Sequence, residues 1–312
     1  SKQILERFPA FDGKRQTSSR GYQDTSRARI LEGLLMRICV ITGSRADYGM
    51  LEWPIKLLKA DPFFEVEVVK VWNFSFSEAY EQIIVGTRPD VLMVLGDRYE
   101  ILACATAAHL QRIPIAHIAG GDVTEGSYDD AMRDAISRMA SIHFVTSTSA
   151  MARLTHMGYR NIHLVGSPGI DYIKHADWKR ERPYNEPYVV VSFQAETIDG
   201  TVDRDWWFLL PNKKQVYIRP NPDLGSDEVN GIIESRLFGA NEAFDFLPHD
   251  EFLNLIYHCD EFIGNSSAML YEAPELEIKT RMIGKRQRGR VIPWGDGHAS
   301  ERIVKTLKYT NL

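Results

Sequence analysis

Short apolar runs alternate with helical patterns along most of the chain from Met36 onward. Runs of this length are typical of buried strands, and between them apolar residues such as Leu51, Ile55 and Leu58 recur at helical spacing. The strands are predicted at 38–42, 65–72, 91–95, 113–118, 142–146, 162–165, 188–193, 215–219, 243–247, 261–263 and 280–283. Such an alternation predicts an α/β protein with parallel sheets and right-handed crossovers.

A polar stretch that contains Pro183 and Pro187 interrupts this pattern once, which indicates two doubly wound, Rossmann-like domains. The predicted segments are a leader or tag-like arm at 1–35, an N-terminal domain at 36–173, a linker at 174–187, a C-terminal domain at 188–297, and a final helix at 298–312 that packs back on the N-terminal domain. Ligands of such sheets bind at the carboxyl ends of the strands, so the cleft between the domains is the predicted site.

Charge and composition narrow the function classes. The 312 residues carry a formal net charge of −5, but 1–35 hold seven Lys and Arg against four Asp and Glu, so the remaining chain carries −8. An acidic body argues against a nucleic-acid partner, which needs a basic face. No apolar stretch approaches the ~18 residues that span a membrane, and the first residues do not resemble a signal peptide. Three dispersed cysteines indicate neither disulfides nor a zinc site, so a cytoplasmic location is expected.

Two loops of the N-terminal domain combine charge with a strand end. The first strand leads into a glycine-containing turn with Arg45 and Asp47, where backbone N–H groups and a guanidinium could bind an anion. A plain turn explains this loop equally well. The third strand ends in Asp97 and Arg98, which face the expected cleft; Asp97 as a helix N-cap is the simpler alternative.

A third loop follows the fourth strand and holds His117 and several carboxylates. The acidic residues of this loop and of the helix that follows include Asp122, Glu125, Asp129 and Asp130. Repulsion between clustered carboxylates can raise one pKa and so prepare an acid/base pair. A solvated acidic loop is the alternative.

The C-terminal domain offers a second candidate anion site. Asn221 follows a strand, and a run of small polar residues, Asn265, Ser266 and Ser267, forms a strand-to-helix junction. Glu272 in the following helix could accept the two hydroxyls of a ribose, and Arg286 lies in a cationic loop that could instead be a solvated basic run.

Five motifs in this order resemble the hydrolysing UDP-N-acetylglucosamine 2-epimerases. They are Thr-Gly-Ser-Arg-Ala-Asp-Tyr-Gly at 42–49, Leu-Gly-Asp-Arg-Tyr-Glu at 95–100, His-Ile-Ala-Gly-Gly-Asp-Val-Thr-Glu-Gly at 117–126, Gly-Asn-Ser-Ser with Glu-Ala-Pro at 264–274, and Gly-Lys-Arg-Gln-Arg-Gly-Arg at 284–290. The resemblance implies a fold of glycosyltransferase-B type, in which the C-terminal domain binds UDP. It also implies loss of UDP from UDP-GlcNAc by elimination, hydration of the glycal to ManNAc, no metal ion or nicotinamide cofactor, and a homodimer or homotetramer. The product would supply the synthesis of sialic-acid-like sugars.

The resemblance also implies roles for individual residues. Asp97 and Asp129 match the acid/base carboxylates, Arg45 and Arg98 the contacts to phosphate or sugar, and Glu272 the ribose ligand. Asn221, Ser266, Ser267 and Arg286 match contacts to the nucleotide and its diphosphate. Further candidate substrate contacts are Asp47, His117, Arg133, Gln194 and Asn265.

Two positions differ from the family pattern. Ala119 stands where relatives carry Glu, for which Asp122 or Glu125 could substitute, and Gln194 stands where relatives carry a catalytic His. A neutral amide cannot exchange protons at neutral pH. A non-hydrolysing epimerase and a UDP-sugar-binding homologue with reduced catalysis therefore remain alternatives.

Overall fold

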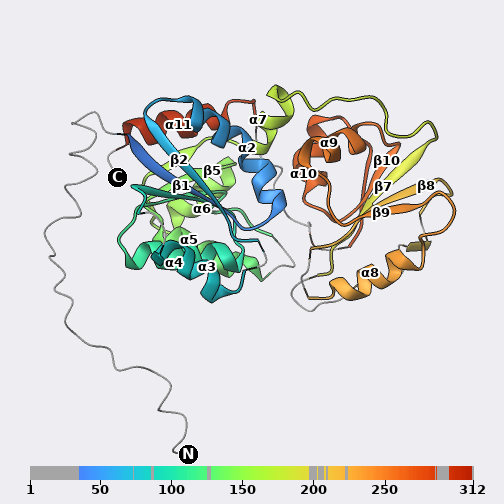
Figure 1. Ribbon diagram of the computed structural model, residues 1–312, viewed down its shortest axis with the longest axis horizontal. Helices are drawn as coiled ribbons and strands as arrows, with labels where there is room; N and C mark the ends of the chain where they lie inside the picture. Colours follow the sequence, from blue (N-terminus) through green and yellow to red (C-terminus); the bar gives the residue numbers. More distant parts are fainter. Residues whose placement is uncertain are drawn as a thin grey trace, which may run out of the picture.

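The computed structural model describes residues 35–310, with gaps at 73, 86–87, 125–127, 197–201, 203–206, 209, 222–223, 285 and 287–294. Leu35 is the single described residue of the predicted leader, and the rest of 1–35 lies outside the described residues. Two bodies of sheet and helix lie side by side (Figure 1).

The first body, called the first domain below, is built on a six-stranded parallel sheet in the order β2-β1-β3-β4-β5-β6. Its strands are β1 (Met36–Thr42), β2 (Phe64–Lys70), β3 (Val91–Leu95), β4 (Ile115–Ile118), β5 (Ile142–Val145) and β6 (Ile162–Leu164). The strand order reverses between β1 and β3, the point at which ligands of doubly wound sheets bind.

The second body carries a five-stranded parallel sheet in the order β11-β10-β7-β8-β9. Its strands are β7 (Tyr188–Ser192), β8 (Lys214–Ile218), β9 (Glu242–Phe244), β10 (Glu261–Gly264) and β11 (Thr280–Met282). The order reverses between β7 and β10. All eleven predicted strands are present within a few residues of their predicted bounds, so the expected pair of doubly wound parallel sheets is confirmed.

Helices cover both faces of each sheet because successive strand residues point to opposite sides. On β1, Ile38 and Val40 pack with α2 and α11, whereas Cys39 and Ile41 pack with α3, α4 and α5. The helices are α2 (Arg45–Ala60), α3 (Phe76–Val85), α4 (Tyr99–Leu110), α5 (Asp129–Met139), α6 (Thr148–His156), α7 (Pro168–His175), α8 (Ser226–Glu234), α9 (His249–Tyr257), α10 (Ala268–Glu275) and α11 (Ala299–Tyr309). No helix in the described part of the chain is long and apolar enough to cross a membrane.

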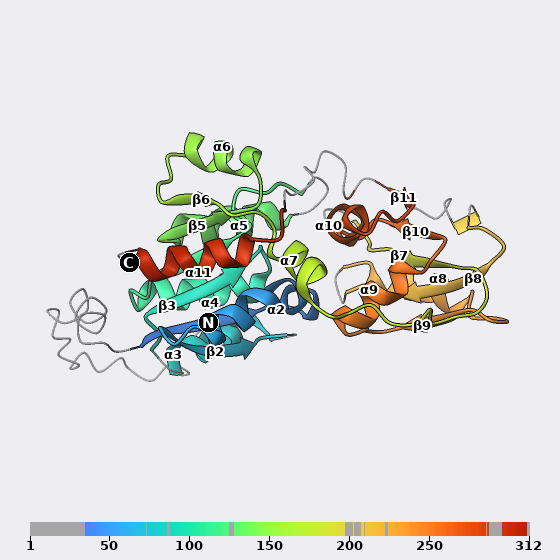
Figure 2. The same ribbon diagram turned by 90° about the horizontal axis from the view of Figure 1, so that it is seen from above.

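The last helix returns to the first domain. Ile303 and Leu307 of α11 are buried in the core that α2 and the first sheet share, and Lys308 forms an ion pair with Asp61. Both views show α11 lying over the first domain and α7 lying between the two domains (Figures 1 and 2). Helix α7 also contributes the cap of α11, because the fully buried Asp171 accepts hydrogen bonds from the backbone N–H groups of Ala299 and Ser300 at 3.1 and 2.6 Å.

Asp171→Ala is expected to destabilise the protein by about 2–4 kcal/mol, because two backbone donors would lose a charged acceptor inside the protein. The free energy of unfolding in urea measures this loss. Asp171→Asn retains an acceptor oxygen and should lose less. Asp177→Ala is the matched control because that carboxylate is fully exposed. Equal stability of wild type and Asp171→Ala would show that the cap does not stabilise α11.

Candidate functional site

A cavity of about 530 Å³ opens where the carboxyl ends of the two sheets face each other. Twelve of the sixteen predicted site residues line it. From the first domain these are Asp47, Asp97, Arg98, Asp122, Asp129 and Arg133, and from the second they are Gln194, Asn221, Ser266, Ser267, Glu272 and Arg286. The structure therefore brings the motifs of both domains to one cleft.

The other four predicted residues lie elsewhere. Glu125 lies outside the described residues, and Arg45 is the first residue of α2, a position at which only its backbone is described. His117 and Asn265 are fully buried and do not line the cavity. Their hydrogen bonds instead support residues that do.

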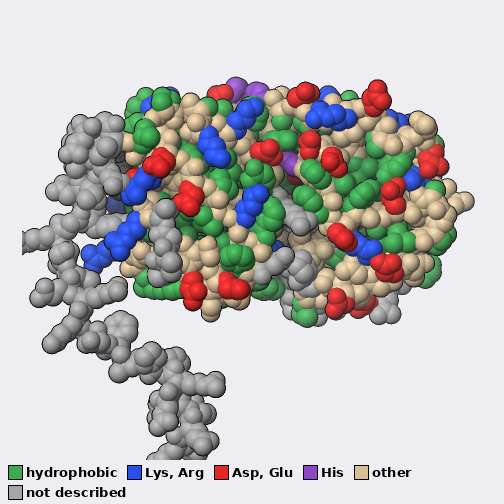
Figure 3. All heavy atoms as spheres, viewed as in Figure 1, with side chains coloured by type: hydrophobic (Ala, Val, Ile, Leu, Met, Phe, Trp, Pro, Cys, Tyr) green, Lys and Arg blue, Asp and Glu red, His purple; other side chains and the backbone are tan. Residues whose placement is uncertain are grey.

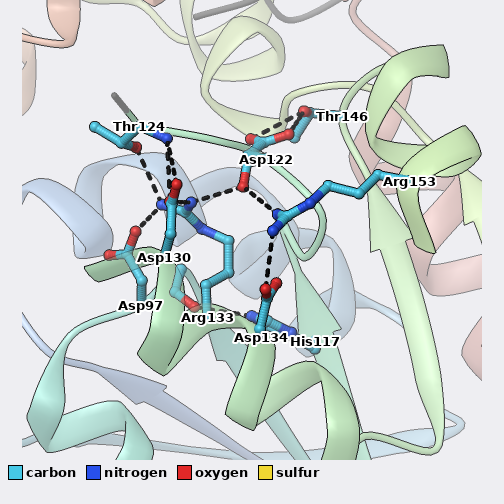
Figure 4. Close-up of polar contacts among 10 residues, drawn as sticks. Asp97, His117, Asp122, Thr124, Asp130, Arg133, Asp134, Thr146 and Arg153 are labelled. Atoms are coloured by element: carbon cyan, nitrogen blue, oxygen red, sulfur yellow. Dashed lines mark hydrogen bonds and ion pairs between the residues drawn. The ribbon is translucent and has the colours of Figure 1, made fainter. Parts of the chain in front are cut away.

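The buried guanidinium of Arg133 organises the wall formed by the first domain (Figure 4). Its side chain is only 3% exposed, and it forms ion pairs with Asp97 on one side and Asp130 on the other. Arg133 Nη1, the nitrogen that pairs with Asp130, also donates to the backbone carbonyl of Asp122 at 2.7 Å. Both carboxylate oxygens of Asp130 accept from the N–H of Thr124. An ion pair with Arg133 favours the charged form of Asp97.

Asp130 does not line the cavity, but it pairs with Arg133, which does, and sequence reasoning gave Asp130 no role of its own. The spacing of Asp130 and Arg133 by three residues at the start of a helix is a signal that could have predicted their ion pair. The helix-cap alternative for Asp97 is wrong, since Arg98 occupies the N-cap position of α4. Asp97 is therefore held by a guanidinium rather than by backbone N–H groups.

Asp122 is fixed in the same wall by neighbouring elements. Its carboxylate accepts a hydrogen bond from Thr146 Oγ1 at 2.8 Å, and its carbonyl also accepts from Arg153, which pairs with Asp134. Figure 4 shows Arg133 and Arg153 converging on this carbonyl. Ala119 also lines the cavity, so this position, for which the resemblance implies a Glu, presents no carboxylate there.

His117 is a structural support beneath the cleft. Its Nε2 lies 2.8 Å from the carbonyl oxygen of Gly96, which can only accept, so Nε2 carries the proton and Nδ1 accepts from the hydroxyl of Ser137 at 3.0 Å. Burial lowers the pKa of His117 to about 4, so the ring is neutral at pH 7. This bridge joins β4 to the turn that presents Asp97.

Arg98 and Asp47 form the rim beside this turn. The Arg98 guanidinium donates from Nε and Nη2 to the buried carboxylate of Glu100, at 3.2 and 3.1 Å. Ser44 caps α2 by accepting from the N–H of Asp47. Burial raises the pKa of Asp47 to about 6, with Arg98 opposing the rise. Its Oδ2 is buried and has no hydrogen-bond partner in the part of the chain that the structure describes.

The wall of the second domain is held by amides rather than by charges. Asn265 accepts from the N–H of Gln194 at 2.7 Å and donates to its carbonyl at 2.8 Å, which ties the ends of β10 and β7 together. Gln194 Oε1 in turn accepts from the backbone N–H of Asn221 after β8. Gly264 allows this approach, because its φ is +144° and a Cβ there would lie 1.8 Å from the carbonyl oxygen of Ser192.

Helix α10 begins at this wall, and Ser266 and Ser267, which precede the helix, line the cavity. The Ser266 hydroxyl accepts a hydrogen bond from the N–H of Ala268, the first residue of the helix, at 3.3 Å. Arg286 lines the same cavity and donates to the carbonyl of Ala195 at 2.8 Å. Two hydroxyls and a guanidinium at the positive end of a helix together suit a phosphate or diphosphate. No group of three or more His, Cys, Asp and Glu side chains in the described residues is arranged to hold a metal ion.

Sequence comparison decides the family. Residues 75–292 match the family described as UDP-N-acetylglucosamine 2-epimerase. The chain belongs to this family. The motif resemblance is thereby confirmed at the level of the family.

Named relatives are similar over most of their length. Polysialic acid biosynthesis protein P7 of Escherichia coli is 26% identical in an alignment 317 positions long, which covers 82% of this chain and 81% of that protein. The UDP-N,N'-diacetylbacillosamine 2-epimerase (hydrolyzing) of Legionella pneumophila is 25% identical in an alignment 319 positions long, which covers 81% of this chain and 82% of that protein.

Solved structures of the family share the fold. The Staphylococcus aureus MnaA–UDP co-structure matches with a TM-score of 0.71 at 17% identity, over 88% of this chain and 96% of that one. The UDP-GlcNAc 2-epimerase of Neisseria meningitidis bound to UDP-GlcNAc matches with a TM-score of 0.71 at 16% identity, over 88% and 100%. These matches confirm the predicted fold of glycosyltransferase-B type.

Asp47→Asn is expected to stabilise this epimerase-family protein above pH 6. A folded-state pKa of about 6 against 3.8 means that the folded state binds more protons, so stability is lost as the pH rises from about 4 to 6. The amide cannot ionise, and the gain at pH 7.5 should be about 3 kcal/mol.

The free energy of unfolding measured between pH 4 and pH 8 tests this expectation. The difference between Asp47→Asn and wild type should grow across that window and level off above pH 7. A constant difference would show that Asp47 ionises normally in the folded protein.

Proposed function

We propose that the protein catalyses the hydrolytic 2-epimerisation of a UDP-linked 2-acetamido sugar, UDP-GlcNAc or a UDP-diacetamido sugar, and releases UDP and the 2-epimer. One observation carries the proposal: a single cavity has ion-paired carboxylates on one wall and a helix N-terminus with hydroxyls and a guanidinium on the other. The first wall can move protons, and the second can hold a diphosphate.

The second wall suits the leaving group. Departure of UDP places negative charge on the diphosphate, and preorganised donors stabilise such developing charge. The hydroxyls of Ser266 and Ser267 and the guanidinium of Arg286 supply those donors at the N-terminus of α10. Glu272, farther along α10, offers carboxylate oxygens to the hydroxyls of the ribose.

The first wall suits the proton transfers. A carboxylate takes the C2 proton, the C2–H electrons form the C1–C2 double bond, and the C1–O pair leaves with UDP. Water then adds at C1 while a proton adds to C2 from the opposite face, which completes the epimerisation. Asp97, held charged by Arg133, is the proposed base, and Asp129 at the start of α5 lies on the same wall as the partner acid. Asp122, which Thr146 orients, is a further proton donor in reach of the cavity.

Two names among the relatives favour the hydrolysing subtype. The Legionella pneumophila enzyme and its Campylobacter jejuni counterpart, a GDP/UDP-N,N'-diacetylbacillosamine 2-epimerase, are both named as hydrolysing and are 25% and 27% identical to this chain. The non-hydrolysing reaction, which would return UDP-ManNAc, uses the same elimination and is the first alternative.

The position of Gln194 favours a second alternative, a UDP-sugar-binding protein with reduced catalysis. Its amide oxygen is occupied by the backbone N–H of Asn221, and an amide cannot replace an acid or a base. In this alternative the nucleotide wall remains intact while the proton transfers are slow.

Incubation of the protein with UDP-GlcNAc in D₂O distinguishes the three functions. The proposal expects free UDP together with ManNAc that carries one deuterium at C2. UDP-ManNAc without free UDP would identify the non-hydrolysing reaction. Calorimetric binding of UDP without turnover would identify the binding protein for this substrate.

Asp97→Asn is expected to lower kcat by about a hundred- to ten-thousandfold, because an amide cannot accept the C2 proton. UDP affinity should change little, since Asp97 lies on the opposite wall from α10. Asp177→Asn is the control, because its carboxylate is fully exposed. Full activity of Asp97→Asn would exclude Asp97 as the base.

A further inference from the structure

One side chain of the second domain fits into a notch on the first. His249 begins α9, and its ring lies against Gly49 of α2. A Cβ added at Gly49 would lie 2.9 Å from Cγ, 3.0 Å from Nδ1 and 3.2 Å from Cβ of His249. Two of these atoms lie at the base of the side chain, so a rotation of the ring would not relieve the clash. The contact therefore depends on the absence of a side chain at position 49.

The imidazole is enclosed on its other sides as well. Its ring centroid lies 4.6 Å from that of Tyr172 on α7, the helix between the domains, and the side chain is only 12% exposed. Its Nδ1 is buried without a hydrogen-bond partner among the described residues. The ring is thus held by packing against the first domain and α7. Its position therefore depends on the contact between the two domains.

The remaining nitrogen of the ring faces the proposed nucleotide wall. His249 Nε2 lies 3.8 Å from Oε1 of Glu272, which is itself 13% exposed and lines the cavity. This distance is within ion-pair range but too long for a hydrogen bond. Glu272 Oε2 is also buried, and no residue that the structure describes forms a hydrogen bond with it. Among the described residues, the imidazole is therefore the polar group against which the Glu272 carboxylate rests.

We infer that His249 is a positioning residue that couples contact between the domains to nucleotide binding by holding the Glu272 carboxylate in place. This inference rests on the proposed function, which assigns Glu272 to the ribose hydroxyls. When the domains meet, the notch at Gly49 fixes the ring, and the ring fixes the carboxylate. By linkage, a nucleotide bound to Glu272 stabilises the contact between the domains to the same extent.

Substitutions on opposite domains test this coupling. Gly49→Ala displaces the ring from the side of the first domain and alters no residue of the second domain, and it is expected to weaken UDP binding at least about fivefold in titration calorimetry. It should also increase the radius of gyration in small-angle X-ray scattering, because the notch is filled. Gly231→Ala is the matched control, since Gly231 also lies within a helix and a Cβ there meets nothing within 4 Å.

His249 substitutions separate the two parts of the inference. His249→Phe retains a ring for the notch but has no nitrogen, so UDP affinity should fall while the radius of gyration stays that of wild type. His249→Ala removes the ring, should change both quantities, and carries the test if Gly49→Ala fails to fold. Circular dichroism and thermal melting establish folding for each variant.

Two results would overturn the inference. Wild-type affinity and radius for a folded Gly49→Ala, or for His249→Ala in its place, would show that the contact does not couple the domains to the nucleotide. Wild-type UDP affinity for His249→Phe would show that the ring nitrogen does not position Glu272. If wild type itself binds no UDP, the proposed function fails, and the scattering comparison still decides whether His249 holds the domains together.

Discussion

The candidate active site depends on the neutralisation of one buried cation. An unpaired guanidinium inside a protein carries a desolvation penalty of several kcal/mol. Three contacts offset this penalty for Arg133. It forms ion pairs with Asp97 at the end of β3 and with Asp130 on its own helix, and it donates to the carbonyl of Asp122. The positions of the Asp97 and Asp130 carboxylates are therefore a consequence of the charge balance around Arg133.

Different interactions hold the two walls of the cleft, which suits a reaction that both transfers protons and releases a diphosphate. The first wall is rich in carboxylates and ion pairs, and it presents charge where protons would be transferred. The second is fixed by the neutral amides of Asn265 and Gln194, and it presents the hydroxyls of Ser266 and Ser267 to the cavity. Over the face drawn in Figure 3, acidic and basic side chains are interspersed rather than gathered into the basic face of a nucleic-acid binder.

Much of this arrangement is predictable from the order of residues along the chain. The strands are recognisable because buried parallel strands are continuous apolar runs, and most of the site follows from the rule that parallel strands end at one edge. The roles of His117 and Asn265 are not predictable in this way. Each ends or follows a buried strand as a ligand-binding residue would, and only the surrounding packing directs His117 to Gly96 and Asn265 to Gln194.

The sequence by itself determined the two parallel sheets, because these depend on local periodicity. It also determined the order of the polar loops along the chain and the family, because these depend on motifs of adjacent residues. The tertiary structure alone decided which charges pair, which predicted residues reach the cavity and which lie beneath it. It also decided that His249 meets Gly49, two residues that are 200 positions apart in the chain. Ion pairing, desolvation and close packing act through space, so distance along the chain does not reveal them.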